Sequence, residues 1–219
     1  MDEIRLRALE PEDLDVLYSI ENDIELWSSG YTTVPYSRYL LHDYIANATC
    51  DIYADRQVRL MAVTRNTDDV VGTVDITGYE PRHNRAELGL VIRKKYRKKG
   101  YGRQIVEEIL KFSHNIIHLH QLYVVIDESN ERALELFKNI GFETSHVLKE
   151  WLFDGEKYRN AVFLTYFQYF LSKTLVSLRK SPYLCTRLNE ATTTGALVQL
   201  VRMPACHAGG HEFESRTHR

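Results

Sequence analysis

The feature of this chain that most constrains its fold is an apolar segment followed by a basic, glycine-containing loop and an amphipathic helix. The apolar segment covers residues 86–92, and residues 93–103 carry seven basic side chains together with Gly100 and Gly102. Apolar residues then recur at helical spacing from Ile105 to Ile116. Glycines let backbone N–H groups approach an anion, and a helix N-terminus favours negative charge. The segment therefore predicts a phosphate-binding turn between a strand and a helix.

The rest of the chain alternates between strand and helix patterns. We expect strands over residues 4–9, 58–64, 70–77, 86–92, 122–126, 142–153 and 159–166, and helices over residues 11–21, 39–48, 101–118 and 130–139. Residues 22–37 read mostly as loop. Gly141 is expected to end the last helix, and Asp127 or Ser129 to cap its start. The order predicts an α+β, or mixed α/β, domain that ends near residue 170.

Composition excludes several classes of protein. Among 219 residues the net charge is −2, so the basic loop is a local feature and no nucleic-acid partner is expected. Three widely spaced cysteines support neither a disulfide framework nor a zinc site, which favours a cytoplasmic protein. The N-terminus lacks the pattern of a signal peptide, and no apolar run approaches the length of a membrane span.

Residues 171–219 differ from the rest in composition. They are rich in Ser, Thr and Arg, show little periodicity, and end in a stretch that resembles frameshifted or vector-derived sequence. We therefore expect a poorly structured tail after a domain over residues 1–170. Cys206, His207 and His211 lack the spacing of a closed metal site, and no metal is expected.

Two motifs carry a resemblance to a known family. Residues 97–102, Arg-Lys-Lys-Gly-Tyr-Gly, resemble the Arg/Gln-x-x-Gly-x-Gly/Ala signature of the GNAT acetyltransferases, and residues 130–143 resemble the downstream signature in which an Asn opens the last helix and a Gly-Phe turn closes it. The resemblance covers about residues 3–168. It implies a GNAT fold: a mostly antiparallel sheet of six to seven strands, splayed at the acetyl-CoA site and flanked by about four helices.

The resemblance also implies a set of residues that bind acetyl-CoA, the acyl donor. They are three residues of one strand whose backbone binds the pantetheine arm, the basic loop, which binds the pyrophosphate, and two residues of the last helix. The implied residues are Leu90, Val91 and Ile92 for the arm, Arg97, Lys98, Lys99, Gly100, Tyr101, Gly102 and Arg103 for the pyrophosphate, and Asn130 and Phe137 on the helix. Asn130 also has a simpler interpretation as a helix cap, and the two are compatible.

Acetyl transfer to an amine needs a base for the ammonium proton. Glu87 lies on the strand that carries the donor edge and shares a face with Gly89 and Val91, and Asp75 lies on the preceding strand. Either carboxylate could act as a base, directly or through water, or could attract a cationic substrate. The alternative is that both are surface carboxylates on a half-exposed sheet.

The leaving thiolate needs a proton, and here the sequence departs from the family. Many relatives carry a Tyr as the proposed general acid at the position of Phe137, whose ring has no proton to give. Water or another hydroxyl would then substitute, with Tyr101, Tyr123 and Tyr158 as candidates. Otherwise the chain is a non-catalytic acyl-CoA-binding module.

The resemblance within the family is to spermidine N-acetyltransferases, with ribosomal-protein N-terminal acetyltransferases as close relatives. It implies a primary-amine substrate such as spermidine, or a protein or peptide N-terminus, and a homo-oligomer. A polyamine site needs clustered acids, but residues 36–45 contain only Asp43, and Asp75 is followed closely by Thr77 and Gly78. Residues 21–25 hold three acids, which form either an acidic patch or solvated charges at a helix end.

Overall fold

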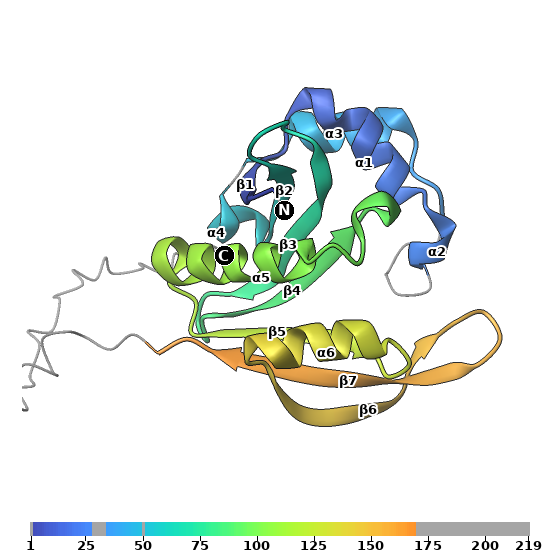
Figure 1. The fold of residues 1–219 in the computed structure, drawn as a ribbon, viewed down its shortest axis with the longest axis vertical. Coiled ribbons are helices and arrows are strands. Elements are labelled where there is room, and N and C mark those ends of the chain that lie inside the picture. Colours follow the sequence, from blue (N-terminus) through green and yellow to red (C-terminus); the bar gives the residue numbers. More distant parts are fainter. Residues whose placement is uncertain (1, 28–33, 50, 170–219) are drawn as a thin grey trace, which may run out of the picture. The chain divides into compact units, whose positions relative to one another are not determined.

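Seven strands form one sheet in the computed structural model, which describes residues 2–27, 34–49 and 51–169 (Figure 1). The sheet order is β1-β2-β3-β4-β5-β7-β6. Neighbouring strands are antiparallel except β4 and β5, which are parallel. The strands are β1 (Ile4–Ala8), β2 (Val58–Thr64), β3 (Val70–Glu80), β4 (Arg85–Ile92), β5 (Gln121–Asp127), β6 (Glu143–Phe153) and β7 (Tyr158–Phe167).

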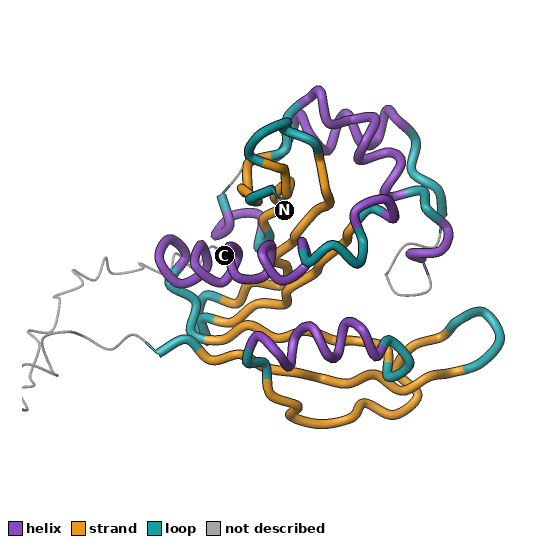
Figure 2. Tube along the Cα trace, viewed as in Figure 1, coloured by secondary structure: helices purple, strands orange, loops and turns teal. Residues whose placement is uncertain are grey.

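Helices precede β2, join β4 to β5, and join β5 to β6 (Figure 2). Four of them have at least eight residues and correspond to the four expected from the sequence: α1 (Leu14–Glu21), α3 (Arg38–Ala46), α5 (Tyr101–Phe112) and α6 (Glu131–Ile140). Single turns form η1 (Pro11–Asp13), α2 (Ile24–Trp27), α4 (Ile52–Asp55) and η2 (Lys94–Tyr96). None of the described helices has the length and apolar character needed to cross a bilayer.

The alternation of apolar residues along β2 explains why helices cover both faces of the sheet there. Leu60 and Ala62 belong to the main core cluster together with Ile105 of α5. Met61 points the other way and packs in a second cluster with Val16 of α1. The long helices α5 and α6 therefore bury one face, and α1 buries the opposite face at the β1–β2–β3 end.

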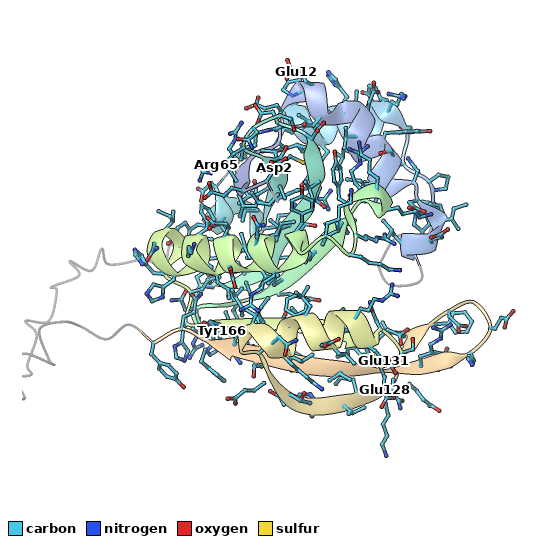
Figure 3. All side chains as sticks on the ribbon, viewed as in Figure 1. Asp2, Glu12, Arg65, Glu128, Glu131 and Tyr166 are labelled. Atoms are coloured by element: carbon cyan, nitrogen blue, oxygen red, sulfur yellow. The ribbon has the colours of Figure 1, made fainter. Side chains whose placement is uncertain are left out.

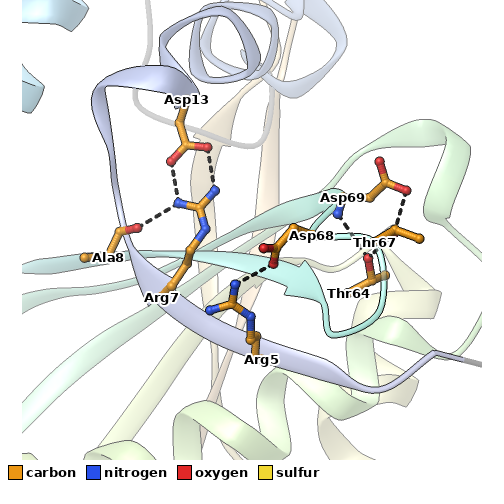
Figure 4. Close-up of polar contacts among 8 residues, drawn as sticks. All are labelled: Arg5, Arg7, Ala8, Asp13, Thr64, Thr67, Asp68 and Asp69. Atoms are coloured by element: carbon orange, nitrogen blue, oxygen red, sulfur yellow. Dashed lines mark hydrogen bonds and ion pairs between the residues drawn. The ribbon is translucent and has the colours of Figure 1, made fainter.

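A partly buried ion pair fixes the start of α1 to the edge of the sheet (Figure 4). Arg7 of β1 donates two hydrogen bonds to Asp13, at 2.6 and 2.7 Å, and a third to the carbonyl of Ala8 at 2.9 Å. Burial alone would raise the pKa of Asp13, but the bonds from Arg7 and from the Glu10 amide outweigh it and hold that pKa below its usual value. The pair sets where α1 begins, and so where its last residue, Glu21, meets the sheet.

The expected helix over residues 101–118 is wrong in its last turn. The α-helix ends at Phe112 and continues as a π-helical turn, η3 (Ser113–Ile117). A π turn widens the helix and shifts the register of the side chains that follow. As a result Ile116, expected on the buried face, is 65% exposed, and Ile117 is buried instead.

Other local expectations also need correction. Residues 24–27 form α2 inside the expected loop, and α4 was not expected. The cap of α6 is Asn130, whose side-chain oxygen accepts from the Ala133 amide at 3.2 Å, and not Asp127 or Ser129. Gly141 ends α6 with φ +114°, as expected. The expected tail, with the cysteine and histidines considered there, lies outside the described residues.

Candidate functional site

The parallel strands β4 and β5 separate soon after they meet. In the described part of the chain they pair over residues 85–87 and 121–123, whereas β4 stays paired with β3 as far as Ile92. Figure 1 shows β4 diverging from β5 toward its C-terminal end. Residues 88–92 therefore border the opening without a strand partner on that side. On this side the Ile92 carbonyl already accepts a hydrogen bond from Arg97 Nε, and the other outward N–H and C=O groups can bind an extended ligand. Leu90, Val91 and Ile92 lie on this segment, and their contact with a pantetheine arm stays a prediction.

The basic loop leads from this edge into α5. Lys98 and Gly100 have positive φ angles, +61° and +76°, and Gly100 is the N-cap residue of the helix. A glycine cap has no side chain to accept hydrogen bonds, and the first amides of a helix have no intrahelical partner. The amides of Tyr101, Gly102 and Arg103 are thus directed at whatever anion lies before the helix. The turn has the backbone geometry that the sequence predicted here, and its binding of phosphate stays a prediction.

Gly102 has a second role, in packing. A Cβ atom at this position would lie 3.1 Å from Ile92 Cδ1 and 3.1 Å from Leu136 Cδ2. The three elements that border the opening, β4, α5 and α6, therefore meet at this glycine. Gly72 similarly admits the backbone of β4, because a Cβ there would lie 2.0 Å from the carbonyl oxygen of Val91.

Five of the seven basic side chains of the loop form two groups, and Arg103 pairs with Glu107 of its own helix at 2.8 Å. Arg93 donates to the carbonyl of Val70 at 2.9 Å, and Lys94 pairs with Glu25 at 2.8 Å and with Asp23 at 3.8 Å. These two cations hold the loop against β3 and α2. They are engaged by the protein itself and contribute less to anion binding.

The second group lies next to the start of α5. Arg97 donates through Nε to the carbonyl of Ile92 at 2.8 Å, and Lys99 lies 5.7 Å from the centroid of the Tyr96 ring. Lys98 has positive φ in the turn. A cavity of about 270 Å³ adjoins this group; its lining residues are Ser19, Ile20, Asp23, Leu26, Val91, Ile92, Arg93, Lys94, Lys95 and Arg97. It extends the open edge of β4 toward α1.

Glu87 lies at the vertex where β4 and β5 separate. It is half-buried and is the register partner of Tyr123 on β5. Its side chain makes no hydrogen bond or ion pair with the described residues. Burial without a nearby cation raises the pKa of its carboxyl group. A carboxylate with a raised pKa is a better general base, so the geometry supports the base role that the sequence suggested for Glu87.

Asp75 is placed differently. Arg59 Nε donates to its Oδ1 at 2.7 Å, and Arg59 Nη2 lies 3.2 Å from its Oδ2. The same guanidinium donates through Nη1 to Glu21 at 2.6 Å. Both oxygens of this carboxylate are thus engaged by charge-assisted hydrogen bonds within the protein. The geometry therefore gives no support to Asp75 as a base.

Sequence reasoning missed Arg59, although a signal was present. The expected strands 58–64 and 70–77 form a hairpin, and counting outward from its turn pairs Thr64 with Val70 and Arg59 with Asp75. The structure contains this Arg59–Asp75 pair despite a bulge near Ala62. Opposite charges at paired positions of one face form an ion pair.

The acids considered as a patch near the end of α1 are each paired with a cation of the protein. Glu21 is bound by Arg59, and Asp23 and Glu25 are bound by Lys94. Among the described residues no group of His, Cys, Asp or Glu side chains is arranged to hold a metal ion.

Phe137, whose ring has no proton to give, is 5% exposed and packs edge-on against Phe142 with ring centroids 5.0 Å apart. Of the three alternative hydroxyls, Tyr101 is buried in the core and Tyr158 packs on Phe153 in the β6–β7 hairpin. Tyr123 lies opposite Glu87 on β5. It is the best placed of the three.

Comparison with known proteins agrees with the geometry of the site. Residues 3–143 match the acetyltransferase (GNAT) domain family. The chain belongs to this family. It is thus an acetyl-CoA-dependent N-acetyltransferase, and the family expected from residues 97–102 and 130–143 is confirmed.

Curated relatives of this GNAT acetyltransferase include the spermidine N(1)-acetyltransferase of Escherichia coli strain K12, 25% identical over 167 residues, which are 76% of this chain and 87% of the relative. An L-amino acid N-acetyltransferase of the same strain is 20% identical over 75% of this chain and 98% of the relative. A spermidine N-acetyltransferase structure from Vibrio cholerae, in complex with CoA and spermine, superposes with a TM-score of 0.68 at 23% identity, covering 76% of this chain and 96% of that chain. The expected GNAT fold is thereby confirmed.

Proposed function

We propose that this GNAT acetyltransferase transfers the acetyl group of acetyl-CoA to a primary amine of a small molecule. One observation carries the proposal: the unpaired edge of β4 begins beside Glu87 and leads to the free amides at the start of α5. In this proposal residues 90–92 bind the pantetheine arm, the amides of residues 100–103 bind the pyrophosphate, and Arg97, Lys98 and Lys99 add positive charge. Asn130, at the start of α6, contacts the pantetheine arm while capping its own helix.

The proposed chemistry assigns one step to each group. Glu87 accepts a proton from the ammonium, directly or through water, because only the neutral amine is a nucleophile. The amine nitrogen then forms a bond to the thioester carbonyl carbon, and the carbon–sulfur bond breaks. The departing thiolate takes a proton from Tyr123 or from water, since Phe137 has none to give, and the proton that the amide nitrogen loses as the amide forms restores that donor.

The first acceptors to test are spermidine and spermine, because the Escherichia coli relative is a spermidine N(1)-acetyltransferase and a structural neighbour was solved with spermine. Amino acids come next, because another relative is an L-amino acid N-acetyltransferase. Peptide N-termini are a further candidate; an N-alpha-acetyltransferase of Sulfurisphaera tokodaii is 26% identical over 32% of this chain.

The test is release of free thiol from acetyl-CoA by the full chain in the presence of each acceptor. We expect turnover with at least one amine, and loss of turnover on Glu87→Gln with acetyl-CoA affinity retained. Calorimetric binding of acetyl-CoA without turnover of any of these acceptors would refute the proposed class of acceptor. Absence of acetyl-CoA binding would refute the proposed site.

We also propose that the protein assembles into a homo-oligomer. A spermidine N-acetyltransferase of Vibrio cholerae has been described as dodecameric. In this chain the β6–β7 hairpin exposes Trp151, Phe153 and Tyr158 by 58%, 56% and 64%. Adjacent exposed aromatic side chains are typical of protein interfaces. Light scattering of the full chain and of a Trp151→Ala variant would test this interface.

A further inference from the structure

Arg59 lies between two carboxylates that come from different elements. It projects from β2 and binds Asp75 of β3 and Glu21 at the end of α1, at 2.6 to 3.2 Å. The three side chains are 24%, 15% and 16% exposed, respectively. Burial lowers the pKa of Arg59, but the charges of Asp75 and Glu21 outweigh it and keep the guanidinium protonated. The guanidinium therefore keeps its positive charge between the two carboxylates.

This charged group adjoins the proposed base. Asp75 pairs with Gly89 across β3 and β4, and a Cβ atom on Gly89 would lie 3.8 Å from Asp75 Oδ2. Gly89 and Glu87 share a face of β4 because they are two residues apart. Since Gly89 has no side chain, none of its atoms fills the space between Glu87 and the Arg59 group. An amine held for attack beside Glu87 has this group as its neighbour.

The charges decide which amine fits. Glu21 and Asp75 bring two negative charges and Arg59 brings one positive charge, so the group has a net charge of −1. Together with Glu87, these carboxylates would attract an amine with several positive charges if Arg59 were absent. The guanidinium cancels one of the negative charges and repels a second ammonium that approaches it. We infer that Arg59 is a specificity-determining residue that selects an acceptor amine with one positive charge and disfavours polyamines. This inference rests on the proposed function and names the class of its substrate.

The first test compares two acceptors, spermidine and hexylamine, with the full chain. Arg59→Met removes the cation and leaves both carboxylates unpaired, so the kcat/KM ratio of spermidine to hexylamine should rise by about tenfold or more, as expected for close charge pairs. Asp75→Asn removes one negative charge and should lower the ratio. Arg65→Met is the matched control, because Arg65 pairs with Glu3 at the surface, away from the start of α5, and should leave the ratio unchanged (Figure 3).

Arg59→Lys separates charge from structure. Lysine keeps the positive charge but cannot reproduce the two-sided hydrogen bonding of a guanidinium. If Arg59 acts through charge, the ratio in Arg59→Lys stays close to that of the wild type. If Arg59 only braces α1, lysine fails to rescue and both acceptors lose activity together. Arg59→Lys and Asp75→Asn also keep the test available if Arg59→Met does not fold.

Binding of spermine by calorimetry, without acetyl-CoA, gives a readout that does not need turnover. We expect Arg59→Met to bind spermine about tenfold more tightly than the wild type, as for a newly freed charge pair, and Arg65→Met to match the wild type. Equal spermine affinity in folded wild type and Arg59→Met would overturn the inference, as would a wild type that prefers spermidine to hexylamine by more than about tenfold, a difference of 1.4 kcal/mol. Failure of the proposed function is a separate result: no thiol release with any amine.

Discussion

At the scale of single residues, Glu87 combines partial burial with the absence of a cation partner in the described chain. As the proposed base it must be ionised to work, so kcat/KM should rise with pH through its raised pKa and level off above it. Glu87→Gln should remove this limb and lower kcat/KM by about 10²–10⁴-fold, the usual contribution of a general base. The pH profile of thiol release measures both effects. If kcat/KM of Glu87→Gln rose with pH as in the wild type, the rise would belong to another titrating group.

The same carboxyl predicts a stability effect of opposite sign. A raised pKa means that the native state binds the proton more tightly than the unfolded state does. The contribution of Glu87 to stability is thus present at low pH and is lost as the pH rises through the raised pKa. Glu87→Gln should therefore raise the melting temperature at pH 7 but not at acidic pH. Glu12→Gln is the control, since Glu12 is exposed in η1 and should show neither effect (Figure 3).

Phe137 offers a gain-of-function test. A Phe137→Tyr substitution adds a hydroxyl at the position where many relatives carry the proposed general acid. We expect kcat to rise by about tenfold, less than the ~10²–10⁴ of an optimised acid because the surrounding residues are adapted to Phe. Because Phe137 is buried, stability should fall by about 1–3 kcal/mol unless the hydroxyl finds a partner. A constant kcat would leave proton donation to Tyr123 or water.

At this scale, the sequence predicted the position of a functional residue only where its partners are close to it in the sequence. The glycines and cations of residues 97–103 form a contiguous motif, so their place in the turn was predictable. Arg59 and Asp75 belong to different strands and become one group only through the register of the β2–β3 hairpin. Whether Glu87 or Asp75 is unpaired depends on that register, so a sequence pattern without register could not choose between them.

At the scale of elements, the junction of β4, α5 and α6 at Gly102 predicts a separation of stability from binding. In Gly102→Ala the helix gains about 1 kcal/mol of propensity, while the new Cβ presses on Ile92 and Leu136 at 3.1 Å and costs a similar amount. We expect little change in the free energy of unfolding. Acetyl-CoA affinity should fall by about tenfold, because the displaced turn holds the amides that bind phosphate.

Calorimetry with acetyl-CoA and denaturant unfolding measure these two quantities. Lys111→Ala is a control on the same helix, since Lys111 lies in its last turn and pairs with exposed Glu108. An equal loss of affinity in both variants would mean that helix stability, and not the glycine contact, governs binding.

Elements with a continuous pattern were predictable to within a few residues, and those shaped by tertiary contacts were not. Strand 58–64 was expected over its observed bounds because apolar residues on both of its faces meet helices. The end of α5 was misplaced because the π turn at Ser113 has no signature in apolar spacing. Ser113 donates to the Leu110 carbonyl, and Gln168 binds both residues. That contact between the end of α5 and the residue after β7 is invisible to a local pattern.

At the scale of the described domain, the sheet consists of two parts joined at β4 and β5. The part β1–β4 and the part β5-β7-β6 share three paired positions along these strands, and α5 contacts α6 across the junction. Acetyl-CoA bound along the open edge would touch both parts. A ligand that binds only the folded protein stabilises it by about 2.7 kcal/mol at a concentration 100 times its Kd. We therefore expect saturating acetyl-CoA to raise the melting temperature of the full chain.

Hydrogen exchange locates where that stabilisation acts. With acetyl-CoA bound, amides of residues 88–92 and 100–103 should exchange more slowly, because the ligand covers the unpaired edge and the start of α5. Amides of β1, at the far edge of the sheet, should slow less, since β1 meets only β2 among the described strands. Desulfo-CoA is a useful comparison, because it keeps the pyrophosphate and should protect residues 100–103 equally. Protection confined to β1 and β2 would place the donor elsewhere and remove the basis for the assigned site.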